Sequence, residues 1–171
     1  AVFCTATQPE LGQFLPTGSR LTELAPDPQK LFDFYRRVEV SVLGKLKDAE
    51  LLQRLNDHQQ VLCIVNTRRH AKGLFDGLEG EGAFHLSTLM CPVHRKQTLA
   101  DIRQRLSAGH PCRVISTSVL EAGVDLDFPV GYRALAGLDS INQAAGRINR
   151  EMRSEIETLY VFEADTPYIK R

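Results

Sequence analysis

The chain alternates short apolar runs with amphipathic segments, a rhythm that is clearest from residue 48 onward. The run Val61–Val65 is short and continuously apolar, as a buried strand is, and apolar residues recur at helical spacing on either side of it. Strands that alternate with helices of this kind indicate βαβ units, and therefore an α/β fold with a parallel sheet covered on both faces. We expect strands at 35–42 (half exposed or at an edge), 61–65, 84–89, 114–116, 132–135 and 158–162, and helices at 48–58, 68–78, 95–106 and 140–150.

The first thirty residues do not follow this rhythm. Four prolines and two glycines lie between residues 8 and 30, a density typical of a connector. The apolar opening Ala1–Cys4 has the character of a strand rather than of a free terminus. We therefore expect the chain to be the C-terminal portion of a larger protein.

Composition narrows the class of protein. The 171 residues are 43% hydrophobic, which suits one packed domain, and they contain no apolar run near the ~20 residues of a membrane-spanning helix, so we expect no membrane contact. The 21 basic and 21 acidic residues cancel, so any nucleic-acid contact must come from a local patch. The four cysteines form no Cys-x-x-Cys pair and show no ligand spacing with the five histidines, which favours buried, reduced thiols in the cytoplasm and no metal site.

Polar residues follow three of the predicted strands, at Asn66–Arg69, Ser116–Ser118 and Gly137–Asp139. Ligands of open parallel sheets bind outside the carboxyl ends of the strands. Hydroxyl and amide groups at the start of a helix also favour anions, because unpaired N–H groups and the helix dipole point there. An anion site is therefore one interpretation of each strand end, and ordinary helix capping is the other.

The predicted helix 140–150 carries a polar stripe. Gln143, Arg147 and Arg150 lie at i, i+4 and i+7 and would share one face, with Gly146 beside them. A glycine inside a helix costs about 1 kcal/mol relative to alanine, so it suggests close approach by a partner. Guanidinium groups donate paired hydrogen bonds to phosphates, and we expect the stripe to face a polyphosphate at the mouth of the sheet. A solvated basic helix face is the alternative.

These residues also form recognisable motifs. Residues 143–150 (Gln-Ala-Ala-Gly-Arg-Ile-Asn-Arg) resemble motif VI of superfamily 2 helicases, and residues 116–127 resemble motif V of the CRISPR-associated helicase-nucleases of type I systems. Residues 5–9 (Thr-Ala-Thr-Gln-Pro) are similar to motif III of that family, 64–69 to motif IV, and 89–95 stand where it carries motif IVa. The motifs occur in the family's order and cover nearly the whole chain.

The resemblance implies a RecA-like fold, an open and mainly parallel sheet with helices on both faces. It assigns residues 1–30 to the tail of a first motor domain and a connector, and residues 31–171 to the second RecA-like domain, with motifs IV to VI. ATP would lie between the two domains, with Arg150 as the arginine finger, Arg147 as a second phosphate contact and Gln143 as a sensor of the γ-phosphate. The other implied roles are nucleotide binding by Gly123, Asp125 and Gly146, DNA binding by Asn66, Thr67, Arg68, His94, Arg95 and Thr117, and coupling of the two by Thr5, Ala6 and Thr7.

The function implied by the resemblance is ATP-dependent translocation on single-stranded DNA during CRISPR interference, in the cytoplasm of a prokaryote. The implied partners are single-stranded DNA, the first RecA-like domain and a CRISPR surveillance complex. The sequence has no Walker A or Walker B motif, so we expect the first domain to hold Mg²⁺ and the isolated chain to be inactive. Two alternatives remain: a superfamily 2 helicase half acting on RNA or duplex DNA, and a non-catalytic, motor-like docking module.

Overall fold

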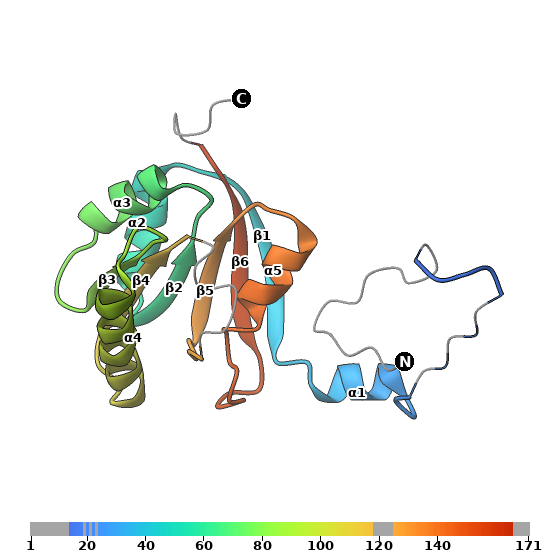
Figure 1. Ribbon diagram of the computed structural model, residues 1–171. Coiled ribbons are helices and arrows are strands. Elements are labelled where there is room, and N and C mark those ends of the chain that lie inside the picture. Colours follow the sequence, from blue (N-terminus) through green and yellow to red (C-terminus); the bar gives the residue numbers. More distant parts are fainter. Residues whose placement is uncertain (1–13, 19, 21, 23, 118–124, 166–171) are drawn as a thin grey trace. The chain divides into compact units, whose positions relative to one another are not determined.

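The structure is a computed structural model (Figure 1) that describes residues 14–18, 20, 22, 24–117 and 125–165. The chain divides into two compact units, residues 1–36 and 37–171. In the smaller unit, helix α1 (Pro28–Phe34) begins where the Asp27 carboxylate accepts a hydrogen bond from the Lys30 N–H at 3.0 Å. The assignment of residues 1–30 to the tail of a first motor domain stays a prediction.

The larger unit is built on one six-stranded sheet in which every strand pair is parallel, in the order β1-β6-β5-β2-β4-β3. This confirms the predicted open α/β sheet, and it brings the carboxyl ends of all six strands to one edge. The strands are β1 (Val38–Leu46), β2 (Gln60–Ile64), β3 (Ala83–Leu86), β4 (Cys112–Ser116), β5 (Val130–Ala134) and β6 (Glu157–Ala164). The helices are α2 (Asp48–Asp57), α3 (Arg68–Asp76), α4 (Pro92–Ser107) and α5 (Leu138–Ala145).

Helices cover both faces of the sheet, as predicted (Figure 1). On one face, Leu51 and Leu55 of α2 and Leu74 of α3 are buried against the strands. On the other, Ile102 of α4 and Ala144 of α5 join a second buried cluster. The apolar stripes of the four helices therefore supply two separate cores, one on each side of the sheet.

Most predicted elements are present with shifted ends. The edge strand predicted at 35–42 is β1, which lies at the edge of the sheet but begins at Val38 and continues to Leu46. The strand predicted at 84–89 ends at Leu86, which releases the next residues into a loop. This shift places Thr88 and Leu89 in a loop, where both line a hollow at the carboxyl edge of the sheet.

The helix predicted at 140–150 was wrong in its second half. Helix α5 ends at Ala145, and Gly146 is its C-cap. The next residues pair with Phe128 instead: the Phe128 N–H donates to the Arg147 carbonyl at 3.0 Å, and the Asn149 N–H donates to the Phe128 carbonyl at 2.9 Å. Asn149 also has a φ of 45°, which a helix does not accommodate. Gln143, Arg147 and Arg150 therefore do not form a helical stripe.

The cysteine prediction was right for two of the described thiols and wrong for the third. Cys63 and Cys112 are buried in strands, and burial raises the pKa of both thiols, that of Cys112 to about 12. Cys91 is exposed just before α4, and Cys4 lies outside the described residues. None of the helices that the structure describes is long and apolar enough to cross a bilayer.

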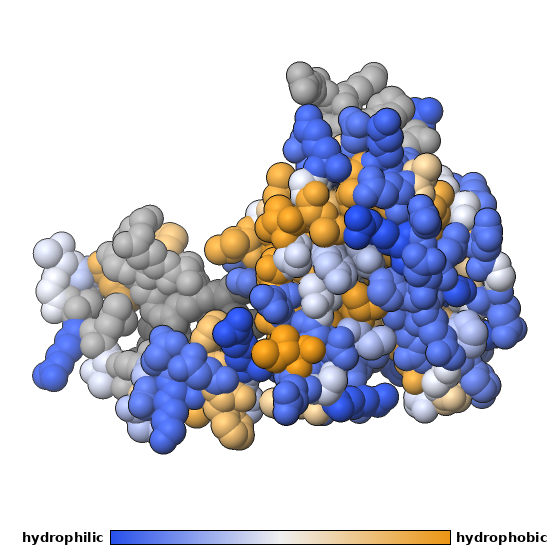
Figure 2. Space-filling model, turned by 180° about the vertical axis from the view of Figure 1, so that it is seen from behind, coloured by the Kyte–Doolittle hydropathy of each residue, from blue (hydrophilic) through white to orange (hydrophobic). Residues whose placement is uncertain are grey.

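The visible surface of the protein is mostly hydrophilic (Figure 2). Figure 2 shows the rear face of the molecule, on which hydrophilic residues predominate and apolar residues form smaller patches between them. The 21 basic and 21 acidic residues of the chain cancel, so a nucleic-acid contact has to be sought in a local feature.

Candidate functional site

A hollow of about 590 Å³ opens at the carboxyl edge of the sheet, where three neighbouring strands, β2, β4 and β3, end. Polar residues that follow these strands converge there because parallel strands present their carboxyl ends at the same edge. Four residues predicted to bind DNA line it together with three others. The lining residues are Asn66, Thr67, Arg68, Arg69, Thr88, Leu89 and Thr117.

Thr117 gives this hollow its clearest chemical signal. Its side chain is buried, with 5% of the residue exposed, and its Oγ1 has no hydrogen-bond partner among the described residues. Burying a hydroxyl without a hydrogen-bond partner costs free energy, so its presence suggests that a ligand supplies the partner. Thr67 caps α3 by accepting a hydrogen bond from the His70 N–H at 3.2 Å, so the start of that helix lies at the hollow. The hydroxyl and the helix start together suit an anion.

Asn66 lies at the same hollow, but its amide is engaged within the fold. Its Nδ2 donates to the Leu135 carbonyl at 2.8 Å, and its Oδ1 accepts a hydrogen bond from Arg133 Nη1 at 2.6 Å. Arg133 is buried, with 3% of the residue exposed. Arg133 was not among the predicted site residues, although an arginine in an otherwise apolar strand indicates a buried charge that needs partners.

The remaining DNA-binding predictions have different outcomes. His94 and Arg95 lie in the first turn of α4, which also begins near the carboxyl edge, but neither lines the hollow. Thr88 does line it and was missed, because the predicted strand extended over it. The roles of His94 and Arg95 in DNA binding stay predictions.

Arg150 and Asp125, both predicted to contact nucleotide, meet in the structure. Arg150 Nε lies 3.0 Å from Asp125 Oδ1, and the two side chains are 42% and 78% exposed. The Arg150 N–H also donates to Asp127 Oδ1 at 2.7 Å, which fixes the backbone of the arginine. Arg147 is half-buried, and burial together with the like charge of Arg150 lowers its pKa. Arg150 therefore lies at the surface with a defined orientation.

The position of this pair corrects a further expectation. Helix α5 starts at the carboxyl end of β5 and runs back, and Ile148 pairs with Phe128, just before β5 begins. The arginines are therefore on the amino side of the strands and not at the mouth of the sheet, where the stripe was expected to face a polyphosphate. Gly123 and the coupling residues Thr5, Ala6 and Thr7 lie outside the described residues.

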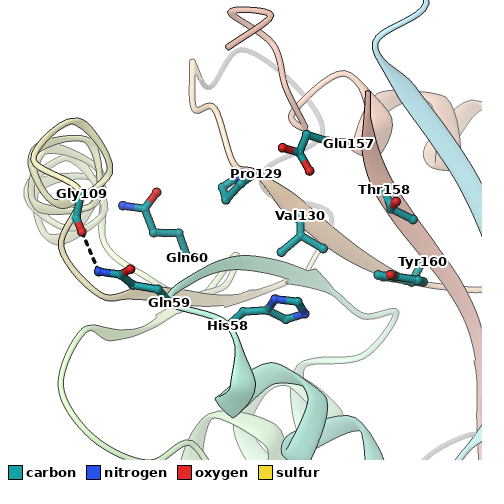
Figure 3. Close-up of a pocket in the computed structure, with 9 residues that line it drawn as sticks. All are labelled: His58, Gln59, Gln60, Gly109, Pro129, Val130, Glu157, Thr158 and Tyr160. Carbon is teal, nitrogen blue, oxygen red and sulfur yellow. Dashed lines mark hydrogen bonds between the residues drawn. The ribbon is translucent and has the colours of Figure 1, made fainter. Parts of the chain in front are cut away.

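A second hollow, of about 430 Å³, lies at the amino ends of β2, β5 and β6 (Figure 3). Its polar side chains bond within the fold: Gln59 Nε2 donates to the Gly109 carbonyl at 2.8 Å, and His58 Nε2 lies 3.1 Å from the Tyr132 hydroxyl. Burial lowers the pKa of His58 and raises that of Tyr132 to about 12, so both are neutral near pH 7. None of the predicted site residues lines this hollow.

Metal ligands do not gather anywhere in the part of the chain that the structure describes. No group of three or more His, Cys, Asp or Glu side chains there is arranged to hold an ion.

Comparisons with known proteins identify relatives. Residues 57–153 match the family described as CRISPR-associated nuclease/helicase Cas3, C-terminal. A CRISPR-associated nuclease/helicase Cas3 of Methanothermobacter thermautotrophicus is 30% identical over 128 residues, which are 73% of this chain and 15% of that protein. One of Haloferax volcanii is 48% identical over 120 residues, 64% of this chain and 12% of that protein. The chain thus spans only 12–15% of these curated relatives.

Solved structures show the same fold. Cas3 of T. fusca with AMPPNP superposes with a TM-score of 0.61 at 19% identity, over 80% of this chain and 19% of that one. A chain in a CRISPR RNA-guided surveillance complex, in a pre-nicking state, gives a TM-score of 0.59 at 20% identity, over 80% of this chain and 20% of that one. At these identities the likeness concerns the fold, and it confirms the RecA-like class predicted from the sequence.

Proposed function

This chain belongs to the C-terminal family of the CRISPR-associated nuclease/helicase Cas3, and we propose that it works as the second motor domain of an ATP-dependent translocase on single-stranded DNA. The first RecA-like domain, in the same or a partner chain, would supply the Walker motifs and the Mg²⁺ ligands. A CRISPR surveillance complex would supply the single strand by opening its target. ATP would bind between the two domains.

The carboxyl-edge hollow carries the proposal for DNA binding. Thr117 offers a buried hydroxyl with no partner in the described part of the chain, and Thr67 and Arg68 stand at the start of α3 beside it. A backbone phosphate would accept hydrogen bonds from Thr117 and from the helix start, with Arg68 adding charge. Contacts of this type read no base, so they suit a motor that moves along a strand of any sequence.

The Arg150–Asp125 pair supports the proposal for ATP. Arg150 is exposed enough to reach a second domain, and the Asp125 carboxylate uses only its Nε, so the other guanidinium N–H groups can meet a γ-phosphate. Asp125 would orient the arginine before the nucleotide arrives. A cation that meets charge developing in the transition state accelerates phosphoryl transfer.

The proposal is tested with the chain joined to a first motor domain that carries the Walker motifs. We expect single-stranded oligothymidylate to stimulate ATP hydrolysis, and Thr117→Val to weaken oligonucleotide binding by about tenfold, the loss of one hydrogen bond to a charged group. The same substitution should leave the free energy of unfolding unchanged or raise it, because the methyl group replaces an unpartnered hydroxyl. Equal DNA affinity in both proteins would remove Thr117 from the DNA site.

Gly146 offers a separate test of the nucleotide side. Its φ of −63° suits any residue, and an added Cβ would meet only the carbonyl oxygens of Gln143 and Asn142, at 3.3 and 3.6 Å. Gly146→Ala should therefore keep the fold. If ATP approaches closely there, its hydrolysis should fall by about ten- to a hundredfold through misplacement. Gly137→Ala, at the other end of α5, is the matched control and should keep full activity; an active Gly146→Ala protein would contradict close approach.

A further inference from the structure

We propose that Arg133 is a positioning residue for the DNA-binding hollow, acting as a buried clamp that holds Asn66 and thereby fixes the start of α3. The inference rests on the proposed function, since the hollow is the site it deepens. It assigns a role to a residue that does not line the hollow and that the sequence motifs do not include.

The clamp consists of reciprocal hydrogen bonds between two paired strands. From β5, Arg133 Nη1 donates to Asn66 Oδ1 at 2.6 Å and to the Ala134 carbonyl at 2.9 Å, and it lies 3.5 Å from the Ile64 carbonyl. In return, Asn66 Nδ2 donates to the Leu135 carbonyl at 2.8 Å. Arg133 and Ile64 are register partners, so the bonds close the gap where β2 and β5 end.

Burial makes this arrangement rigid. A guanidinium that is only 3% exposed depends on the hydrogen bonds that it makes inside the protein, so Arg133 has little freedom to leave the acceptors of its Nη1. The short bond to Asn66 is charge-assisted and therefore stronger than a neutral one. Asn66 is held in one orientation because both ends of its amide form hydrogen bonds with the same segment, Oδ1 with Arg133 and Nδ2 with the Leu135 carbonyl.

The clamp acts on the hollow because Asn66 is covalently joined to the residues that line it. Asn66 directly precedes Thr67, the N-cap of α3, and Arg68 is the first residue of that helix. Fixing Asn66 therefore fixes the hydroxyl of Thr67 and the N–H groups that would meet a phosphate. Binding sites lose affinity when the supporting residues are loose, because the ligand must then order them. In this proposal Asn66 holds the loop, and Thr67, Arg68 and Thr117 hold the phosphate.

Oligothymidylate of roughly 20 nucleotides is the probe, with its affinity for the chain measured between about 50 and 200 mM salt. Arg133→Lys keeps the positive charge but removes the planar guanidinium group. Asn66→Ala removes the side chain that the guanidinium holds. Each should weaken binding about tenfold, which corresponds to about 1.4 kcal/mol. The double variant should be no weaker than either single one, because both break the same contact.

Salt dependence separates positioning from contact. Arg133→Lys should leave the slope of log affinity against log salt unchanged, whereas Arg68→Ala should lower it by about one phosphate contact. The matched control is Arg113→Lys. Arg113 also donates to backbone carbonyls, among them those of His58 at 2.9 Å and Asn56 at 3.2 Å, but at the amino end of β4. This variant should lower stability without changing DNA affinity below its melting temperature.

Hydrogen exchange keeps the clamp testable without DNA. Amides of Thr67 and Arg68 should exchange faster in Arg133→Lys than in the unaltered chain, and no faster in Arg113→Lys. Unchanged exchange, additive losses in the double variant, or equal loss of affinity in Arg113→Lys would overturn the clamp. If the unaltered chain fails to bind DNA while exchange responds as expected, the proposed DNA function fails and the clamp stands as a local structural device.

Discussion

Arg150→Ala is expected to reduce DNA-stimulated ATP hydrolysis by about 10³-fold or more once the chain is joined to a first motor domain, because an arginine finger typically contributes 10³ to 10⁵ in rate. The effect should appear in kcat, since the guanidinium meets charge that develops in the transition state. Stability should change by less than about 1 kcal/mol, because the pair with Asp125 is exposed. The measurement is steady-state hydrolysis with saturating oligonucleotide, beside a urea titration.

Arg153→Ala provides the matched control for this prediction. Arg153 is a neighbouring arginine that pairs with Glu151, with Nη2 and Oε2 2.6 Å apart, and its side chain is 57% exposed. It lies in the same loop but outside the predicted motif, so its removal should leave kcat within about twofold. A normal kcat in Arg150→Ala would show that Arg150 is not the finger, even if hydrolysis itself is present.

Asn149→Ala is expected to have the largest effect on stability, about 2–4 kcal/mol, because it removes buried hydrogen bonds and strains the backbone. Asn149 Nδ2 donates to the Ser154 carbonyl at 2.8 Å and to the Arg37 carbonyl at 3.1 Å, and its Oδ1 accepts from the Ser154 N–H at 3.3 Å. Its φ of 45° is tolerated by asparagine better than by alanine. The free energy of unfolding in urea measures the loss.

Two further substitutions separate the contribution of the side-chain hydrogen bonds from that of the backbone conformation. Asn149→Gly keeps access to positive φ and loses only the side-chain bonds, so it should cost less than Asn149→Ala. Asn142→Ala, at an exposed position of α5, is the neutral control, because alanine favours a helix. A loss below about 0.5 kcal/mol in Asn149→Ala would mean that this asparagine does not hold the turn. Since the turn lies between Arg147 and Arg150, a loosened Asn149 should also disturb the arginines.

The sequence predicted the strands and helices of the larger unit well, because each relies on a local pattern. A short apolar run such as Val61–Val65 becomes a buried strand in any parallel sheet. The segment after Ser140 shows the limit of such reasoning. Its apolar residues keep helical spacing through Ile148, yet the helix ends at Ala145. The backbone of Phe128 forms hydrogen bonds with Arg147 and Asn149 instead. Contacts with a segment distant in sequence overrode the local preference.

The sequence predicted which residues belong to the candidate site better than how they are arranged. Motif resemblance placed six residues in one DNA-binding group, and the fold brings four of them, Asn66, Thr67, Arg68 and Thr117, to one hollow. The other two, His94 and Arg95, do not line it. The resemblance placed Arg150 and Asp125 in another group, and they form an ion pair. What it could not show is that the two groups lie toward opposite ends of the strands, because that depends on the direction in which α5 returns along the sheet.

By itself, then, the sequence determined the alternation of strands and helices, the family, and the residue types available for phosphate chemistry, since all of these depend on neighbours along the chain. The tertiary structure alone decided which groups are buried, paired or exposed. It left the Thr117 hydroxyl without a partner among the residues that the structure describes, engaged the Asn66 amide with Arg133, and placed Arg150 at the surface. The physical reason is that burial and hydrogen bonding are set by whichever distant segments pack nearby, and local sequence does not record them.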